Sequence, residues 1–314
     1  MKRKVLVTGG AGFIGSHVAE AFLAAGDDVT ILDDLSSGRR ANVPAGATFV
    51  EADVRSPEAR DLVASGAFAV LDHHAAQIDV RRSVDTPALD AGINVVGLVN
   101  LLEGARAGGV RRVVFASSGG TVYGEGTALP VAEPAPKLPA SPYGTAKLAS
   151  EYYLATFGLL YGIEAVALRY SNVYGPRQDP YGEAGVVAIF SERLLKGEPL
   201  TIFGDGEQTR DLVYVGDVAD ANLLASRHAV APLTSLDARA FNVGTGVETS
   251  VNQLAARLAA AAGRRPDLHH APARAGEILR SALDISRAGR ELGWRPRVSL
   301  SEGLTSTFRW FAED

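Results

Sequence analysis

The chain has 314 residues, a net charge of −5 and no cysteine. This length suits one large domain with a smaller partner. The lack of cysteine excludes disulfides, a thiolate nucleophile and Cys-ligated zinc. Without a Lys/Arg block, the chain also lacks the basic face of proteins that bind nucleic acid or membrane surfaces. We see no run of about 18 apolar residues, so we expect a cytoplasmic protein without a membrane span.

Six short apolar runs alternate with helical patterns through the first half of the chain. The runs predict strands at 5–7, 29–32, 48–50, 67–71, 112–116 and 164–169. The helical patterns cover 13–25, 86–108 and 142–161. Near-continuous apolar strands that alternate with helices predict a parallel sheet covered on both faces.

The pattern of the sequence changes after Pro176. Proline, glycine and short predicted elements dominate from there on. Two later helices are predicted, at 250–262 and 301–311. We therefore expect an α/β fold, in which a Rossmann-type doubly wound parallel sheet joins a smaller C-terminal substrate-binding α/β region. The expected division is 1–175 for the Rossmann-type domain and 176–314 mainly for the smaller region, with about 211–245 returning to the first.

A glycine-rich turn lies between the first predicted strand and the first helix. Gly9, Gly12 and Gly15 form a GxxGxxG pattern. In this context the first glycine permits a tight turn, the second lets a pyrophosphate approach the backbone, and the third lets helix and strand pack closely. The helix N-terminus offers N–H groups and partial positive charge to phosphate. The turn predicts a dinucleotide site.

Acidic and small residues follow the next strands. Asp33 ends the second strand at the interval expected for an acid that binds the adenosine ribose, and Asp33 with Asp34 would repel a 2′-phosphate, which favours NAD over NADP. Asp53-Val54 follows the third strand, where an acid can bind the adenine amine or simply face solvent. His74-Ala75-Ala76 follows the fourth, with small residues that let the backbone lie close to a cofactor. The adjacent histidines there are not a convincing metal pair, and we expect no metal site.

Tyr143 and Lys147 form a YxxxK pattern behind Ser141-Pro142, an N-cap and first-turn pair. The two side chains then lie one turn apart on one helix face. A free tyrosine has a pKa near 10, too high for a base at neutral pH, and the lysine ammonium and an oxidised nicotinamide would both lower it. Tyr143 is the predicted general base, and Lys147 would also hold the nicotinamide ribose.

Hydroxyl side chains follow the fifth strand in the run Ser117-Ser118-Gly119-Gly120-Thr121. Open α/β sheets place their sites at this end of their strands. A serine here would bond the substrate hydroxyl and ease proton transfer to Tyr143. The alternative is a plain strand-end turn.

With these parts in place, the chain resembles the extended short-chain dehydrogenase/reductases, and within them the UDP-glucose (UDP-galactose) 4-epimerases. The resemblance covers nearly all of the chain. It is carried by the segments already described and by later motifs: Asn94-Val95-Val96-Gly97, Arg169 to Pro176, Gly204-Asp205-Gly206, Thr209-Arg210-Asp211, Tyr214-Val215, Asp217-Val218, Asn242-Val243-Gly244 and Arg274-Ala275-Gly276-Glu277. The resemblance implies NAD-dependent C4 epimerisation of a UDP-hexose through a transient 4-keto sugar, as in galactose metabolism, by a homodimer.

The resemblance also assigns site residues. It places the cofactor against Gly9, Gly12, Phe13, Ile14, Gly15, Asp33, Asp34, Asp53, Val54, His74, Ala75, Ala76, Asn94 and Lys147. Asn172 would contact the sugar-phosphate, and two arginines, Arg210 and Arg274, would clamp the diphosphate, a task suited to guanidinium groups. Glu277 would accept a hydrogen bond from the uridine ribose. Thr201 and Phe203 would line the uracil pocket.

One departure from the family concerns the hydroxyl run. Many epimerases have serine or threonine at its third place, where this chain has Gly119. Ser118 must then take the catalytic role, with Ser117 or Thr121 as alternatives.

The resemblance leaves several reactions and substrates open. Sugar 4,6-dehydratases carry acidic residues, and UDP-glucuronate decarboxylases a glutamate, within the places held here by Gly120-Thr121, so a lyase reaction is disfavoured. A UDP-glucuronate 4-epimerase is disfavoured by Asp179, where such enzymes tend to be basic. A position that gates the C2 substituent falls on Ser281, whose small size predicts that N-acetylated UDP-sugars are accepted. A non-catalytic NAD-binding scaffold and a reductase that releases its cofactor are further alternatives.

Overall fold

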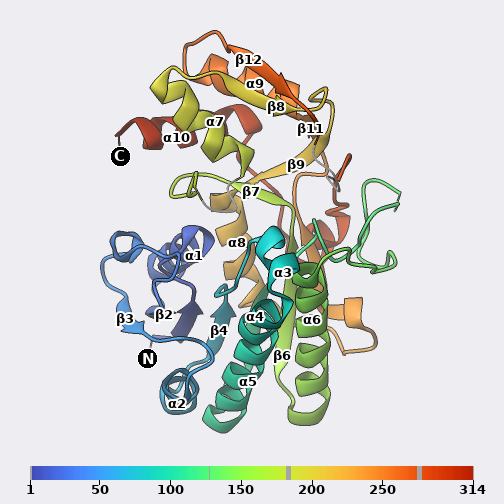
Figure 1. The fold of residues 1–314 in the computed structure, drawn as a ribbon. Coiled ribbons are helices and arrows are strands. Elements are labelled where there is room, and N and C mark those ends of the chain that lie inside the picture. The colour runs from blue at the N-terminus through green and yellow to red at the C-terminus, as the bar shows by residue number, and fades with distance from the viewer. Residues whose placement is uncertain (1, 127, 182–184, 274–277, 314) are drawn as a thin grey trace.

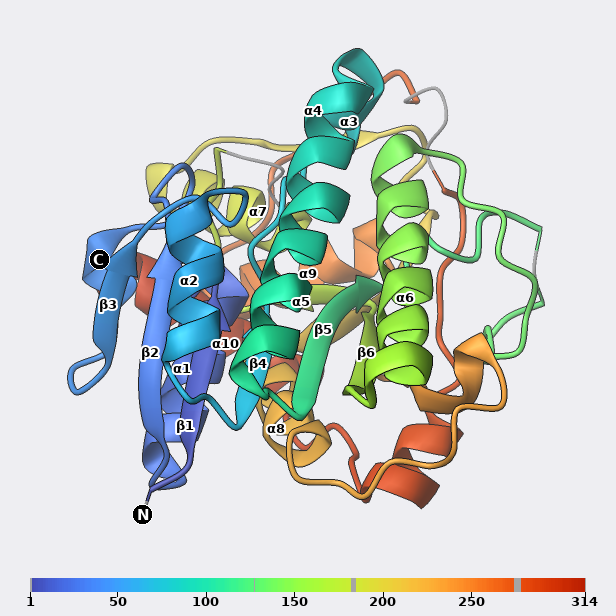
Figure 2. The same cartoon turned by 90° about the horizontal axis from the view of Figure 1, so that it is seen from below.

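A seven-stranded parallel sheet forms the centre of the protein. The computed structural model describes residues 2–126, 128–181, 185–273 and 278–313. The strand order is β10-β6-β5-β4-β1-β2-β3, and every pairing is parallel. Figure 2 shows the labelled strands side by side, from β3 through β2, β1, β4 and β5 to β6. The strands are β1 Lys4–Thr8, β2 Asp28–Asp33, β3 Thr48–Glu51, β4 Val70–His73, β5 Arg112–Ser118, β6 Glu164–Tyr170 and β10 Ala240–Val243.

Helices cover both faces of this sheet, as predicted. On one face lie α1 (Phe13–Ala24) and α8 (Val215–Ala225), and on the other α2 (Pro57–Ser65), α5 (Gly97–Gly108) and α6 (Pro142–Tyr161). Side chains alternate between the two cores, because successive strand residues point to opposite faces. In β1, Val5 and Val7 join the α1/α8 core while Leu6 joins the α2/α5 core. The sequence therefore predicted the doubly wound fold correctly.

The fourth strand begins later than predicted. The expected run was 67–71, whereas β4 starts at Val70. Ala67 has a positive φ of 52°, which a strand residue does not adopt. The apolar run is therefore broken by a turn before the strand.

A long apolar helix precedes β5 and corrects one expectation. Following the short helix α3 (Val80–Asp85), the segment 87–108 runs as α4 (Pro87–Ala91), a π-helical turn (Gly92–Val96) and α5. By length and composition it is apolar enough to cross a membrane, whereas the sequence was expected to hold no such run. Leu98, Leu101 and Leu102 are fully buried in the core shared with α2. Core packing accounts for the apolar character of this helix.

The smaller region forms the upper part of the molecule in Figure 1. It contains a three-stranded sheet in the order β11-β9-β7 and the parallel pair β12-β8. Helices α7, α9 and α10 pack there around Phe190, Leu254 and Leu304. Its elements are β7 Asn172–Tyr174, α7 Val186–Lys196, β8 Leu200–Phe203, β9 Thr209–Tyr214, β11 Glu248–Ser250, α9 Val251–Ala261, β12 Leu268–Ala271 and α10 Leu300–Glu313.

Two elements after β9 lie with the large sheet. Helix α8 packs on α1, and β10 pairs with β6, with Ala240 opposite Ala167. Short turns complete the chain: 3₁₀ turns at Arg40–Asn42 and Leu236–Arg239, and a π-helical turn at Ala288–Leu292. The chain thus crosses from the small region to the large sheet and back.

Candidate active site

The carboxyl ends of the central strands meet at one edge of the sheet. In register, Thr8 of β1 lies beside His73 of β4, His73 beside Phe115 of β5, and Ser118 of β5 beside Tyr170 of β6. In open parallel sheets this edge, next to the point where strand order reverses, is the usual ligand site.

The glycine turn at this edge leaves no room for side chains. Gly9 has φ +68°, and a Cβ there would lie 2.6 Å from the Ala75 nitrogen. A Cβ on Gly15 would collide with the Gly9 carbonyl oxygen. Gly12 is the N-cap of α1, and among the described residues no side chain caps that end. The first-turn amides, which include those of Phe13 and Ile14, are therefore free to bind a pyrophosphate.

Asp33 is held in place at the end of β2. Its carboxylate accepts hydrogen bonds from the amides of Ala11 and Leu35, both at 2.9 Å. Burial raises the pKa of Asp33, and the two amides oppose that shift. Each oxygen keeps a lone pair for a ribose hydroxyl. Asp34 is exposed and accepts from the amide and the hydroxyl of Ser36.

Asp53, the predicted adenine contact, pairs with its neighbour Arg55. The guanidinium holds the pKa of this carboxyl below its usual range. Val54 is buried and packs against Gly97. A Cβ added at Gly97 would lie only 2.8 Å from a Val54 methyl group. A role of Asp53 at adenine stays a prediction.

His74 presents its backbone, not its imidazole, to the glycine turn. The side chain is buried, lies 2.8 Å from the Asp72 carboxylate and stacks on Tyr170 with ring centres 6.3 Å apart. The nitrogen–oxygen distance is that of an ion pair, although within the described residues these atoms are not aligned for a hydrogen bond. Burial raises the pKa of Asp72. The backbone of residues 74–75 approaches Gly9 so closely that it occupies the place of a Cβ there. The small side chains of Ala75 and Ala76 were predicted to allow such a close approach.

Asn94 fastens the loop that carries these alanines. Its side-chain oxygen accepts from the Gln77 amide, and its nitrogen donates to the Gln77 carbonyl and to Asp90, each at 2.9 Å. The side chain is buried. Its direct contact with a cofactor stays a prediction, since both ends of the amide serve the loop here.

Helix α6 carries the predicted base. As expected, Ser141 is the N-cap and accepts from the Gly144 amide, and Pro142 occupies the first turn. The Lys147 ammonium donates to the Ala116 carbonyl at 2.8 Å and lies 5.7 Å from the centre of the Tyr143 ring. Burial lowers the pKa of Lys147 to about 8, against a smaller opposing effect of Asp90. The cation thus stands beside the phenol that it was predicted to activate.

His73 is a site neighbour that sequence reasoning missed. Its Nδ1 is hydrogen-bonded to the Thr8 hydroxyl at 2.7 Å, and its ring stacks on Phe115. Burial, with the nearby Lys147, lowers the pKa of His73 to about 3, so the ring is neutral at physiological pH. The available signal was its place at a strand end, but His73 was considered only as half of a possible metal pair.

Neighbouring serines at the end of β5 have different surroundings. Ser117 is buried and donates to the Glu151 carboxylate of α6 at 2.6 Å. This bond argues against the predicted substrate contact of Ser117. Ser118 is partly exposed, and its hydroxyl has no hydrogen-bond partner within the described part of the chain. The Thr121 hydroxyl is buried and likewise unpartnered there.

A buried ion-pair network lies behind these serines. Arg169 is completely buried and donates to Glu151 at 2.6 and 3.0 Å, to Asp237 at 2.8 Å and to the Tyr123 hydroxyl at 3.1 Å. Sequence reasoning had noticed Arg169 only as part of a family motif. The network ties α6 to β6, and through Glu151 it fixes the helix that carries Lys147.

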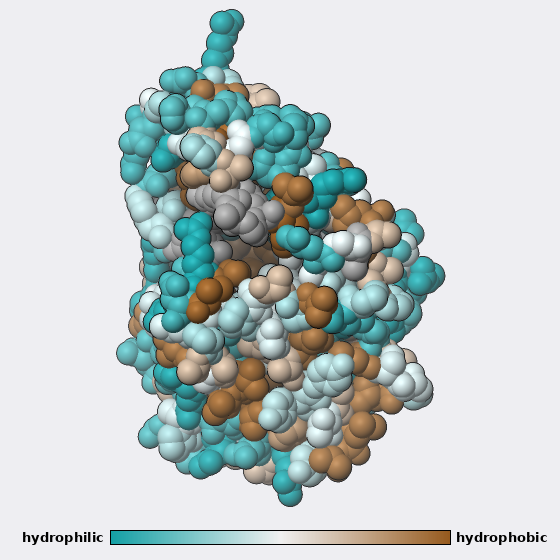
Figure 3. All heavy atoms as spheres, turned by 45° about the vertical axis from the view of Figure 1, so that its right-hand side comes forward, coloured by the Kyte–Doolittle hydropathy of each residue, from teal (hydrophilic) through white to brown (hydrophobic). Residues whose placement is uncertain are grey.

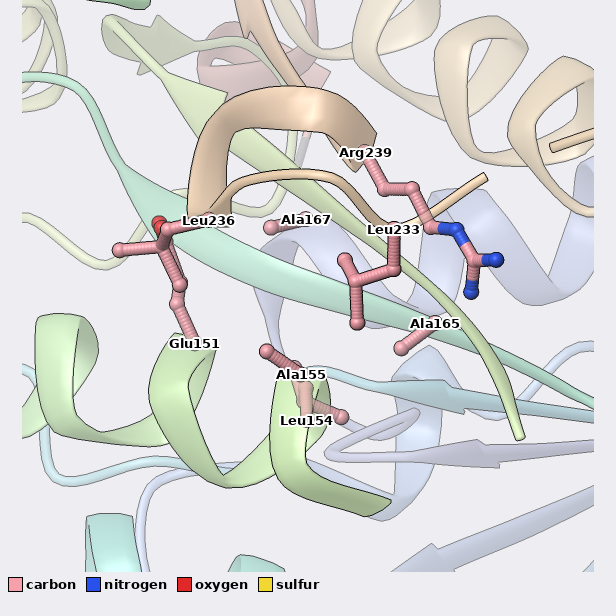
Figure 4. Close-up of a pocket in the computed structure, with 8 residues that line it drawn as sticks. All are labelled: Glu151, Leu154, Ala155, Ala165, Ala167, Leu233, Leu236 and Arg239. Carbon is pink, nitrogen blue, oxygen red and sulfur yellow. The ribbon is translucent and has the colours of Figure 1, made fainter. Parts of the chain in front are cut away.

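Beside this network a small cavity of about 20 Å³ lies between α6, β6 and the turn that follows Leu233 (Figure 4). Glu151 and Arg239 are its charged lining residues. It has room for about one water, so it is not the sugar site.

Residues 278–283 form a strap, an extended segment that lies along β9. This strap contacts Arg210, one of the residues predicted to bind the sugar nucleotide. Arg210 donates to the Ile278 carbonyl at 2.7 Å, and the Thr209 amide donates to the Leu279 carbonyl at 2.9 Å. The buried Asp211 accepts from the Leu283 amide at 3.1 Å. Ser281 lies within this strap. Arg274 and Glu277 lie outside the described residues.

The other predicted substrate residues come from β7 and β8. Asn172 is exposed at the start of β7. Thr201 and Phe203 alternate with Leu200 and Ile202, which are buried in the core of the small region. Thr201 accepts from an Arg193 nitrogen at 2.7 Å. These residues therefore face away from that core, as a binding surface requires.

The sheet order, the glycine turn and the Tyr143/Lys147 helix together define an extended short-chain dehydrogenase/reductase. The model of the NAD dependent epimerase/dehydratase family matches residues 5–244. The chain belongs to this family, whose cofactor is NAD.

Relatives match over nearly the whole chain. A UDP-glucose 4-epimerase of Mycolicibacterium smegmatis is 49% identical, with 98% of each chain covered. The structure of a UDP-glucose 4-epimerase with UDP-glucose from Thermotoga maritima is 45% identical and has a TM-score of 0.94, with 99% of each chain covered. A Thermus thermophilus UDP-glucose 4-epimerase in complex with NAD is 45% identical with a TM-score of 0.90, covering 98% of this chain and 99% of that one.

Proposed function

We propose that this chain is an isomerase that inverts C4 of a UDP-hexose, interconverting UDP-glucose and UDP-galactose with NAD as a retained cofactor. The observation that carries the proposal is the Tyr143/Lys147 pair. It stands at the carboxyl edge of the sheet beside a glycine turn that fits a pyrophosphate. No acidic side chain occupies Gly120-Thr121, so elimination from the sugar lacks an acid and a base there.

The proton steps fall to side chains of α6 and β5. Tyr143, as phenolate, is the base for the sugar 4-hydroxyl, and Ser118 bonds that hydroxyl and passes a proton on to Tyr143. The Lys147 charge stabilises the phenolate. NAD supplies hydride acceptance and return at C4. After the 4-keto sugar has turned its opposite face toward the cofactor, Tyr143 gives the proton back. The complete reaction therefore causes no net oxidation or reduction of the sugar.

Binding of the nucleotide is assigned to the small region. Arg210 and Arg274 are proposed to clamp the diphosphate, Asn172 to contact the sugar-phosphate, and Glu277 to accept from the uridine ribose. Thr201 and Phe203 are proposed to line the uracil pocket. The strap on β9 supports this assignment because it fixes Arg210 next to the chain segment that holds Ser281.

We also propose that UDP-GlcNAc and UDP-GalNAc are substrates. Ser281 is small, and it lies between the two places where the strap is fixed to β9. A tyrosine at Ser281 is expected to raise KM for the N-acetylated sugars and leave KM for UDP-galactose nearly unchanged. Equal KM values for wild type and Ser281→Tyr on UDP-GalNAc would contradict the gate. UDP-glucuronate remains the second candidate substrate.

A homodimer in the cytoplasm is the proposed assembly and location. The proposed division is 1–175 for the NAD-binding domain and 176–314 mainly for the UDP-sugar region, with about 211–245 returning to the first. Support for the dimer comes from exposed apolar side chains: Val96 (59% exposed) in the π-helical turn before α5, and Tyr152 (57%) and Leu159 (71%) on α6. In Figure 3, apolar patches are spread over the lower half of the molecule, where these helices lie. Sedimentation of the wild type and of Leu159→Glu tests this: the variant is expected to sediment as a monomer.

The first experiment incubates the purified protein, without added cofactor, with UDP-galactose and separately with UDP-GalNAc, and follows the products by NMR. Conversion to the C4 epimers is the expected result. Release of water or carbon dioxide would instead identify a lyase, and a need for stoichiometric NADH a reductase. Lack of any conversion after NAD is added would contradict the proposal for these substrates.

A further inference from the structure

Gly119 and Leu283 meet at the sheet edge beside Ser118. A Cβ on Gly119 would lie 2.5 Å from Leu283 Cδ1, 3.0 Å from Cδ2 and 3.1 Å from the Arg169 carbonyl oxygen. Real Cβ atoms essentially never come as close as the first of these. The third place of the hydroxyl run is therefore filled by a side chain from the far end of the sequence.

Leu283 has little freedom to move out of that place. It is 1% exposed and packs with Val122, Tyr123 and Val131. Its backbone is fixed on both sides, because its amide donates to Asp211, and the Val131 amide and carbonyl bond residues 282 and 284. In a close-packed core a displaced side chain forces its neighbours off their preferred positions.

The backbone of Gly119 is fixed as well. Its amide donates to the Tyr170 carbonyl at 2.8 Å, which continues the β5–β6 pairing past Ser118. The next residue, Gly120, has room beside it: of the atoms in the described ranges, a Cβ there would meet within 4 Å only the Ser118 hydroxyl, at 3.9 Å. Ser118 thus borders the open side, while Ser117 is engaged by Glu151.

We propose that Leu283 determines which hydroxyl serves the reaction: it excludes a side chain from position 119 and leaves the role to Ser118. The inference rests on the proposed C4 epimerisation. In the proton step, Ser118 accepts the proton of the sugar 4-hydroxyl as it donates its own to the Tyr143 phenolate, so the serine ends unchanged. Gly119 and Leu283 are then a matched pair, and Leu283 is a positioning residue.

The test moves the hydroxyl by one position. Four variants are compared: S118A, S118A/G119S, S118A/L283A and S118A/G119S/L283A. We expect S118A to lower kcat about 100-fold, and G119S to restore nothing while Leu283 is present. In the L283A background G119S is expected to raise kcat at least tenfold, with KM unchanged. Equal recovery with and without Leu283, or none in the triple variant, would overturn the proposal.

A stability cycle tests the pair without relying on activity. G119S is expected to lower the urea midpoint in the otherwise wild-type protein and to lower it less than half as much in L283A. Additive effects would show that the two residues do not exclude each other. Failure of the wild type to epimerise any UDP-hexose would remove the proposed function while leaving this cycle interpretable. Thr121→Val is the matched control: if it abolishes activity while S118A does not, Thr121 is the working hydroxyl and the proposal fails.

Discussion

The hydroxyl of Ser117 donates a 2.6 Å hydrogen bond to the carboxylate of Glu151, which also receives the buried guanidinium of Arg169. Adjacent serines at the end of one strand are thereby given different tasks. Ser117 belongs to the packing of α6 on the sheet, and Ser118 borders the open side.

Ser117→Ala is expected to lower stability by about 2 kcal/mol, because a hydrogen bond to a buried charge is lost. It should leave kcat within about threefold of wild type, since the proton transfer that general acid–base catalysis supplies is untouched. Urea unfolding and kcat on UDP-galactose measure the two effects. Ser118→Ala is the matched control, with the opposite pattern expected. A larger loss of kcat in Ser117→Ala than in Ser118→Ala would refute the division of tasks.

Glu151→Gln should be among the most destabilising single changes in the sheet region. It removes one of the two carboxylates that pair with the fully buried Arg169 guanidinium. Breaking a buried pair typically costs about 3–5 kcal/mol, and the remaining bond to Asp237 places the expected loss at the lower end. Glu164→Gln is the comparison, because its bond to Arg112 lies partly exposed at the other end of β6 and such pairs contribute about 1 kcal/mol or less. Unfolding midpoints that shift equally in the two variants would argue against this account of the network.

Lys147→Met is expected to abolish epimerisation and yet stabilise the NAD-free protein at pH 7. The native pKa of Lys147 is lowered from 10.5 to about 8, so the buried ammonium opposes folding at every pH below that value. As pH rises from about 8 to 10.5, the native lysine is already neutral while the unfolded one still holds its proton. The destabilisation of the folded state by the Lys147 ammonium therefore decreases across this pH interval.

The stabilisation in Lys147→Met should thus approach 3 kcal/mol at pH 7 and vanish near pH 10.5. Urea titrations of both proteins across this range measure it. A difference that does not change with pH would mean that the lysine charge is not the cause.

Gly12→Ala is expected to fold but to purify without NAD. The added Cβ would lie 3.1 Å from the Gly9 carbonyl oxygen, a tight but tolerable contact, and it would project where the pyrophosphate approaches the helix. The absorbance ratio of the purified protein and NAD released by heating give the cofactor content. Gly92→Ala is the control, because a Cβ there has nothing within 4 Å, and its NAD content should equal that of the wild type.

The parts of the fold with a regular apolar pattern or with typical helix-capping residues were predictable from the sequence. Ser141 is a cap with the expected hydrogen bond, and six of the seven strands of the large sheet were predicted, with β4 beginning later than expected and β10 missed. Helix α7 and the short strands β8, β11 and β12 were not predicted, because their burial depends on partners distant in the chain. Local periodicity does not reveal such partners.

The candidate site divides in the same way. The glycine turn and Tyr143/Lys147 are local patterns on single elements, and so were visible in the sequence. The bond from Ser117 to Glu151 and the contact of Leu283 with Gly119 join residues far apart in sequence. In the sequence alone, Gly119 is only a departure from the hydroxyl motif of the family. Its contact with Leu283 in the structure explains why a glycine stands there.

The return of α8 and β10 to the large sheet has a consequence for recombining this chain with its relatives. A fragment that stopped at residue 175 would leave the β6 edge unpaired and one side of α1 uncovered, and open strand edges invite pairing with other chains. Chimeras that exchange the sugar-binding part must therefore keep 215–243 with the parent that supplies the first half. The exchangeable piece is therefore not a C-terminal half: after β10, the turn at Ala288–Leu292 and Trp294 also pack in the core of the large sheet and must stay with the same parent.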